Sequence, residues 1–134
     1  MSRPFLLDVN ALVGLLWSVH ALHARAHAWF GREKPIVLGC AFTELSFVRV
    51  SMADKTIAAR FADAELILAQ FVASLGQRYR FIDALPPAAV LRGKAIQHHK
   101  EVSDHYLAEL ATAHRAALAT LDSGIKHPAA ELIA

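Results

Sequence analysis

The sequence predicts an α/β protein in which helices cover both faces of a mainly parallel sheet. Short, continuously apolar runs recur along the chain, segments of helical periodicity separate them, and Ala and Leu supply much of the 55% hydrophobic content. Strands of a parallel sheet are buried on both faces, so they are continuously apolar, and a helix usually makes the crossover between two of them. These features predict one domain spanning residues 1–134.

Five apolar runs are predicted to be strands. The first, Phe5–Val9, reaches the carboxylate of Asp8, and the fourth, Ala117–Leu121, ends directly before Asp122. The other strands are expected at residues 36–38, 79–82 and 132–133. The carboxyl ends of parallel strands meet at one edge of the sheet, and such folds bind their ligands there.

Short polar residues and glycines mark the expected helix ends. The expected N-caps, whose side chains accept backbone N–H groups of the first turn, are Asn10, Thr43, Asp54 and either Ser103 or Asp104. A helix over residues 23–30 is expected to end at Gly31, and a long helix over residues 55–75 is expected to end at Gly76. The pair Pro86–Pro87 is expected to open a short helix.

The overall charge is mildly basic, with a net charge of +2 and a pI of about 8.9. This balance permits a polyanionic partner, but the 14 Lys and Arg residues are scattered and form no basic tail. The single cysteine, Cys40, excludes an intramolecular disulfide and is expected to be a small buried residue. No apolar stretch is long enough to span a bilayer, so the sequence favours a cytoplasmic protein without a membrane segment.

Four acidic residues lie where this topology brings distant segments together. Asp8 and Asp122 follow the first and fourth strands, and Glu44 and Asp104 are expected in the first turns of two helices. Taken singly, Asp122, Glu44 and Asp104 are better explained as ordinary helix or turn residues. Asp8 is harder to explain in that way, because it directly follows the buried, apolar residues Phe5–Leu7. The joint placement of the four predicts a shared acidic site at the carboxyl edge of the sheet.

Clustered carboxylates indicate a bound cation. Two carboxylates ~4 Å apart repel each other by roughly 4 kcal/mol at an effective dielectric constant near 20, so the fold needs a compensating charge. Mg²⁺ typically takes one or two carboxylates, several waters and substrate phosphate oxygens, and Mn²⁺ accepts the same oxygen-rich surroundings. The four acids therefore predict a site for Mg²⁺ or Mn²⁺.

The acidic motifs resemble those of PIN-domain ribonucleases, and most closely those of the VapC-type toxins of bacterial toxin–antitoxin systems. The matching strings are Leu7–Leu12, Thr43–Leu45, Ser103–Ala108 and Ala119–Asp122. Each string is short, but their order and spacing from about residue 5 to the end of the chain are specific. The resemblance implies a three-layer α/β/α sandwich with a central, mainly parallel sheet. It also implies a metal-dependent endoribonuclease, whose expected products have 5′-phosphate and 3′-hydroxyl ends.

The resemblance also assigns roles to individual residues. It implies four catalytic acids: Asp8, Glu44, Asp104 and Asp122. Asp8 and Asp104 are expected to bind the metal, whereas Glu44 and Asp122 are expected to act through water or a second ion. Three side chains are expected to support them: Asn10, Thr43 and Thr120. Many PIN domains place further acids after the last of the four, where this chain has Ser123-Gly124, which puts a second tightly held metal in doubt. The resemblance further implies an RNA substrate, a cognate antitoxin protein and a homodimer.

Two alternative functions stay open at the level of sequence. A haloacid-dehalogenase-like phosphatase also places an Asp after its first strand, but it needs a second Asp where this chain has Asn10, and no persuasive Lys partner follows. A non-catalytic regulatory domain with an acidic pocket is the other alternative. The single cysteine disfavours zinc, and dinucleotide binding is disfavoured because no Gly-x-Gly-x-x-Gly follows the first strand. The candidates for RNA phosphate contacts are Arg49, Arg78 and Arg80.

Overall fold

A five-stranded, entirely parallel sheet forms the centre of the computed structural model, which describes residues 3–133. The strand order is β3-β2-β1-β4-β5. The strands are β1 (Pro4–Leu7), β2 (Ile36–Cys40), β3 (Tyr79–Ile82), β4 (Ala117–Thr120) and β5 (Ala130–Leu132). Because β1 is central and all strands point the same way, the segments that follow β1, β2 and β4 leave from neighbouring points of one sheet edge.

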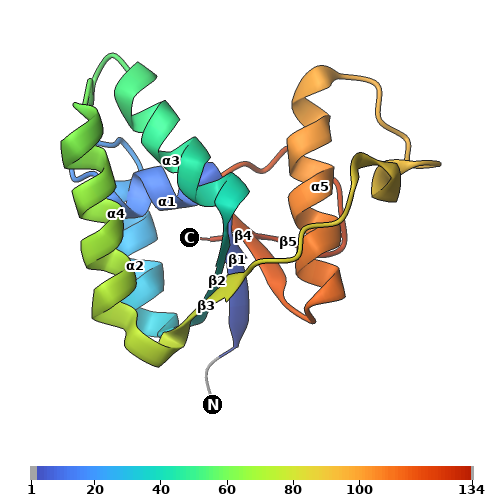
Figure 1. Cartoon of the computed structure of the whole chain (residues 1–134), viewed down its shortest axis with the longest axis horizontal. Helices are drawn as coiled ribbons and strands as arrows, with labels where there is room; N and C mark the ends of the chain where they lie inside the picture. The colour runs from blue at the N-terminus through green and yellow to red at the C-terminus, as the bar shows by residue number, and fades with distance from the viewer. Residues whose placement is uncertain (1–2, 134) are drawn as a thin grey trace.

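Helices cover both faces of this sheet, which confirms the predicted three-layer α/β/α sandwich (Figure 1). One face carries four helices: α1 (Val9–Leu16), α2 (His23–Glu33), α3 (Ala41–Ala53) and α4 (Phe61–Leu75). The other face carries α5 (His99–Ala113), and a short 3₁₀ helix (Ala88–Leu91) precedes it. Among residues 3–133, no helix is long and apolar enough to cross a membrane.

Alternating side chains of β1 divide the core into two layers. Phe5 and Leu7 point into the four-helix layer, where the ring of Phe5 packs edge-on against Trp29 with ring centroids 5.1 Å apart. Leu6 points into the layer beneath α5 and packs with Leu107. The central strand is thus apolar on both faces, as expected for a buried parallel strand.

The first two helices differ from the prediction at their ends. Asp8, and not Asn10, caps α1, because the Asp8 carboxylate accepts the N–H of Val9 at 2.8 Å. The second helix continues through Gly31 and ends at Glu33, because the next residue, Lys34, adopts a left-handed backbone with φ of 45°.

The long helix predicted over residues 55–75 begins only at Phe61. The Asp54 carboxylate accepts the N–H groups of Thr56 at 2.8 Å and Ile57 at 3.2 Å, which holds a turn instead of a first helical turn. Ala58 then adopts a φ of 46°, which a right-handed helix excludes. The predicted end of this helix at Gly76 is confirmed.

The fifth helix begins at His99, one turn earlier than the predicted start at Ser103 or Asp104. The Nδ1 atom of His98 accepts the N–H of Lys100 at 3.2 Å, and the Glu101 carboxylate accepts the N–H of His98 at 3.0 Å. This reciprocal pair satisfies the free N–H groups of the helix start. Asp104 therefore lies in the second turn of α5.

Candidate acidic site at the carboxyl edge of the sheet

A cleft with a volume of about 610 Å³ lies between α3 and α5, over the start of α1. Two of the predicted acids, Asp8 and Asp104, face this cleft. The remaining lining residues are Val9, Asn10, Val13, His20, Phe42, Ser46, Arg49, Val50, Asp54, Lys100, Ser103 and Leu107. The cleft therefore combines carboxylates with cationic and hydroxyl groups.

Asp8 occupies the most buried position of the acidic group, with 6% of its surface exposed. One carboxylate oxygen accepts the N–H of Val9, and the other accepts the hydroxyl of Thr120 at 2.9 Å. Burial raises the pKa of Asp8 above its ordinary value, the two hydrogen bonds lower it, and the charges of Asp104 and Asp122 raise it further. Its carboxylate is thus fixed in place and would be stabilised by a cation.

Asp104 projects from the opposite wall of the cleft and is partly exposed. Burial raises its pKa, and the negative charge of Asp122 raises it as well. Asp104 makes no hydrogen bond within residues 3–133, so both of its oxygens are available to a ligand in the cleft.

Asp122 lies in the loop that follows β4 and is exposed. Its N–H donates to the Thr120 hydroxyl at 3.0 Å, and its carboxylate accepts the N–H of Gly124 at 2.8 Å. Asp122 does not line the cleft, but its charge raises the pKa of both Asp8 and Asp104. The structure therefore brings three of the four predicted acids into one electrostatic group.

Of the three predicted supporting residues, Thr120 contacts Asp8 and Asp122 directly, and Asn10 contacts Thr120. The side-chain oxygen of Asn10 accepts the N–H of Leu121 at 3.1 Å, and its amide nitrogen lies 3.4 Å from the Thr120 hydroxyl. These bonds tie the start of α1 to the end of β4. Thr43 is placed elsewhere, because its hydroxyl accepts the N–H of Cys40 and donates to the Cys40 carbonyl at the start of α3. Thr43 therefore stabilises the helix start and does not contact the acids.

Glu44 is the predicted acid that the structure brings neither into the cleft nor into the group formed by Asp8, Asp104 and Asp122. Its carboxylate accepts a hydrogen bond from the Tyr79 hydroxyl at 2.6 Å. The cleft is lined by Phe42 and Ser46 of α3, and a residue two positions from both lies on the opposite face of a helix. Glu44 thus connects α3 to the edge strand β3.

The carboxylates of Asp8 and Asp104 fit a hard divalent cation. Within residues 3–133, no three His, Cys, Asp or Glu side chains are grouped closely enough to hold a metal ion together. Two carboxylates facing an open cleft match the way Mg²⁺ binds, since this ion keeps several waters and takes further oxygens from the substrate. Burial is the main reason that the pKa values of both groups are raised, and neighbouring negative charges raise them further, so a cation would stabilise the ionised carboxylates.

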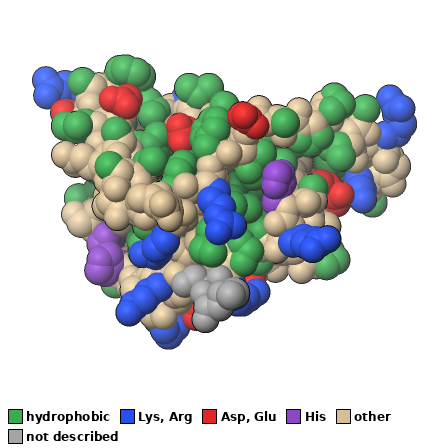
Figure 2. Space-filling view, turned by 60° about the horizontal axis from the view of Figure 1, so that its bottom comes forward, with side chains coloured by type: hydrophobic (Ala, Val, Ile, Leu, Met, Phe, Trp, Pro, Cys, Tyr) green, Lys and Arg blue, Asp and Glu red, His purple; other side chains and the backbone are tan. Residues whose placement is uncertain are grey.

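The three arginines predicted to contact RNA phosphates do not lie together in the structure. Of the three arginines proposed for phosphate contacts, Arg49 lines the cleft. The Arg78 guanidinium instead donates to the Pro35 carbonyl at 3.0 and 3.2 Å, and Arg80 lies at another surface hollow beside β3. Sequence reasoning missed His20 and Lys100, which line the cleft, because no short motif connects them to the acids. On the face near the amino ends of the strands, Lys and Arg side chains form separate groups and not one patch (Figure 2).

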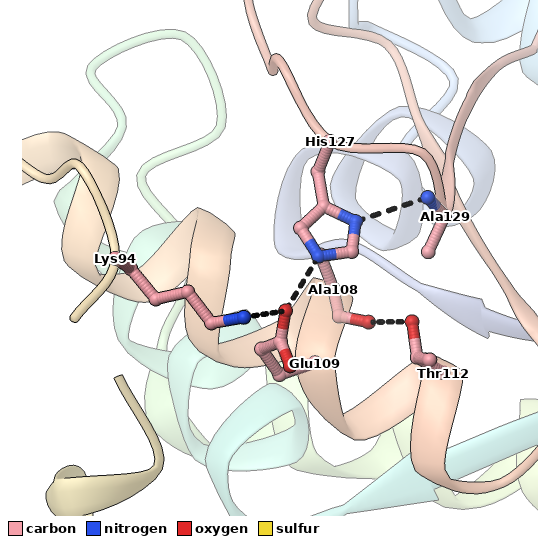
Figure 3. Close-up of polar contacts among 6 residues, drawn as sticks. All are labelled: Lys94, Ala108, Glu109, Thr112, His127 and Ala129. Atoms are coloured by element: carbon pink, nitrogen blue, oxygen red, sulfur yellow. Dashed lines mark hydrogen bonds and ion pairs between the residues drawn. The ribbon is translucent and has the colours of Figure 1, made fainter. Parts of the chain in front are cut away.

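A three-residue contact fixes the loop that carries Asp122 to the helix that carries Asp104 (Figure 3). The Nδ1 atom of His127 accepts the N–H of Ala129, so its Nε2 atom carries the proton and donates to Glu109 on α5 at 2.7 Å. The ammonium group of Lys94 lies 3.3 Å from the same carboxylate oxygen. This contact therefore sets the position of one acidic segment relative to the other.

We expect the His127–Glu109 contact to make stability depend on pH in the acid range. The hydrogen bond from His127 lowers the pKa of Glu109 below 4.5, and Lys94 lowers it further. A lowered carboxyl pKa contributes stability above the unfolded-state value, and that contribution is lost as the pH falls through the folded-state value. His127→Ala should therefore reduce Tm by roughly 3 °C at neutral pH, and the difference from wild type should shrink below pH 4.5. Thermal unfolding across this range tests the prediction, with His27→Ala, an exposed histidine on α2, as the control. An equal loss at every pH would contradict it.

The fold and the cleft together define a PIN-like α/β/α protein with an acidic site at the carboxyl edge of its sheet. Curated proteins of Mycobacterium tuberculosis are similar to this chain over most of their length. Ribonuclease VapC38 of strain ATCC 25618 / H37Rv is 35% identical over 128 residues, which cover 90% of this chain and 86% of that protein. Ribonuclease VapC29 of strain CDC 1551 / Oshkosh is 34% identical, with coverages of 91% and 88%. Ribonuclease VapC39 of the same strain is 30% identical, with coverages of 90% and 89%. No model of a protein family matches the chain. These similarities show that the chain belongs to the VapC family of PIN-domain proteins.

Proposed function

We propose that the protein is a metal-dependent endoribonuclease and the toxin of a toxin–antitoxin pair. The observation that carries this proposal is that Asp8 and Asp104, from two separate elements, face one cleft in a chain whose relatives are named ribonucleases. The proposed substrate is RNA and the proposed metal is Mg²⁺ or Mn²⁺. We place the activity in the cytoplasm.

In this proposal the two cleft carboxylates hold the cation. Asp8 is positioned by the Val9 N–H and the Thr120 hydroxyl, and Asp104 reaches the same cleft from α5. A bound divalent cation would acidify a coordinated water and polarise the scissile phosphate. Asp122 acts through water or a second, weaker ion, because it lies outside the cleft lining. Attack by water on phosphorus with loss of the 3′-oxygen leaves 5′-phosphate and 3′-hydroxyl ends.

The phosphatase alternative is not supported by the position of Asn10. The Asn10 side chain is engaged with Leu121 and Thr120, and it stands where that chemistry requires a second, proton-transferring Asp. A non-catalytic regulatory domain would not need Asp104 to present two unbonded oxygens to the cleft.

Cleavage of total RNA by the purified protein tests the proposed function. We expect cleavage with Mg²⁺ or Mn²⁺ and none in EDTA, and ligation-based mapping should find 5′-phosphate ends. A 2′,3′-cyclic phosphate product would overturn the mechanism, because it requires attack by the RNA's own 2′-hydroxyl group. An absence of RNA cleavage with either metal would overturn the function.

The partners of this chain are proposals as well. An antitoxin would inhibit the site by placing an Arg among the carboxylates, because a guanidinium binds them through two hydrogen bonds and replaces the charge of the cation. A homodimer would cover part of the exposed apolar surface, to which Leu45 at 71% exposure and Phe61 at 60% contribute. Sedimentation of the purified chain measures its oligomeric state.

We keep Glu44 outside the proposed metal site, since Tyr79 binds its carboxylate on the far face of α3. Glu44→Gln is therefore expected to keep the cleavage rate within about threefold of wild type and to lower stability by about 1 kcal/mol, as Tyr79→Phe should, because both weaken one hydrogen bond. Parallel measurements of cleavage rate and urea unfolding test this. Loss of cleavage in Glu44→Gln but not in Tyr79→Phe would return Glu44 to the catalytic acids.

A further inference from the structure

The acidic cleft continues into a second hollow, and His20 stands where the two meet. His20 and Asp54 line both spaces. The second hollow has a volume of about 380 Å³, and its other walls are Val19, Ala21, Thr56 and Ile57. A ligand chain that places one phosphate at Asp8 and Asp104 can therefore pass over His20 into this hollow.

The structure fixes the imidazole of His20 along one edge. Its Nδ1 atom accepts the N–H of Leu22 at 3.0 Å, so the proton of the neutral ring is on Nε2. The ring also lies against the backbone of α1, since a Cβ atom on Gly14 would be 3.5 Å from the His20 Nδ1 atom. The Nε2 atom makes no hydrogen bond to the described part of the chain. The Nε2–H group is therefore a donor with a fixed position and without a partner among residues 3–133.

The turn that carries His20 is itself fixed to two helices. The Nδ1 atom of His23 lies 2.9 Å from the Gly14 carbonyl oxygen of α1, and the indole N–H of Trp17 donates to the Ser51 hydroxyl of α3 at 2.9 Å. Ser51 is fully buried, and its hydroxyl donates to the Phe47 carbonyl. The turn therefore holds His20 at a constant place relative to the acidic cleft.

We propose that the Nε2–H group of His20 binds a phosphate oxygen of the RNA nucleotide next to the scissile bond, with that nucleotide seated in the second hollow. This inference rests on the proposed ribonuclease function. Arg49 and Lys100 also line the cleft, but both are exposed and long, so they supply charge at variable positions. His20 supplies a short donor at one position, which sets the register of the RNA strand.

Two substitutions of His20 test the roles of its two ring nitrogens separately. In His20→Asn, the side-chain oxygen can still accept the Leu22 N–H, but the outer donor is lost. In His20→Gln, the longer amide restores a donor near the Nε2 position. We expect His20→Asn to weaken RNA binding about tenfold, as for the loss of one hydrogen bond to a charged group, and His20→Gln to stay within about threefold of wild type.

Binding is measured by fluorescence anisotropy with a labelled, single-stranded RNA pool of random sequence in Ca²⁺, a hard cation that carboxylates also bind, and a gel run afterwards checks that the RNA is intact, so that binding is read independently of cleavage. The matched control is His27→Asn on the exposed side of α2, which should bind like wild type. As a comparison, Arg49→Ala should lower the slope of log K against log salt by about 0.7, because it removes one cationic side chain from the cleft. Equal binding by wild type and His20→Asn, or equal weakening by His20→Asn and His20→Gln, would overturn the inference. Failure of the wild-type protein to cleave RNA with either metal would instead overturn the proposed function.

Discussion

Replacing Asp8 by Asn should abolish metal-dependent RNA cleavage and at the same time stabilise the metal-free protein. We expect the cleavage rate to fall by at least about 10³-fold, because the substitution removes one of the two charges that hold the cation. Burial and the neighbouring charges of Asp104 and Asp122 raise the pKa of Asp8 in the folded state. Because the folded state disfavours the ionised carboxyl, the free energy of unfolding of wild type falls as the pH rises and Asp8 ionises. The Asn variant has no group to ionise at this position, so it does not lose this stability. The variant should therefore unfold at a higher temperature than wild type at neutral pH.

Thermal unfolding in EDTA at several pH values, together with cleavage assays in Mg²⁺, measures both effects. The gain in Tm should fade as the pH is lowered through the raised pKa, where wild-type Asp8 also becomes neutral. Mg²⁺ should raise the Tm of wild type and not that of the variant. Asp104→Asn should lose cleavage as well, and Asp83→Asn, an exposed acid outside the cleft, serves as the control. Normal cleavage by the Asp8 and Asp104 variants would end the assignment of the site.

The sheet was predictable from the sequence because a parallel strand needs only a short, continuous apolar run. Residues 79–82 form β3 with the predicted bounds, and β1 and β4 each end within two residues of theirs. Helix starts were less predictable, since they depend on caps that composition does not reveal. In α5 the cap is the imidazole of His98, which sequence rules do not favour as a cap.

The acidic site was predictable where a strand end fixes the direction of the side chain. Asp8 and Asp122 follow β1 and β4, and both belong to the acidic group. The orientation of Glu44 depends instead on which face of α3 meets the sheet. Two different faces of α3 carry a Phe: Phe42 borders the cleft, and Phe47 is fully buried in the core. Apolar periodicity therefore did not identify the cleft face, and the interaction with Tyr79, 35 positions away, has no local signal.

Gly39→Ala should destabilise the protein through Tyr79, with the second-largest effect we expect. A Cβ atom on Gly39 of β2 would be 1.7 Å from the Tyr79 hydroxyl oxygen and 2.3 Å from Cζ, so the phenol ring must leave its place. Its departure breaks the hydrogen bond to Glu44 and disturbs the packing of β3 on β2. We expect a loss of about 1–3 kcal/mol in the free energy of unfolding, as for an overpacked core position.

Gly31→Ala is the matched control, because the same change there meets open space. Gly31 lies within α2, and a Cβ atom on it would have no neighbour within 4 Å. Alanine is the better helix former, so this variant should gain up to about 1 kcal/mol. Urea unfolding measures both changes, and a double variant Gly39→Ala/Tyr79→Phe tests their cause. Since Gly39→Ala already breaks the hydrogen bond of the Tyr79 hydroxyl, the second substitution should cost less stability in this background than it does in wild type. Additive losses would show that the clash with Tyr79 is not the reason that Gly39 is required.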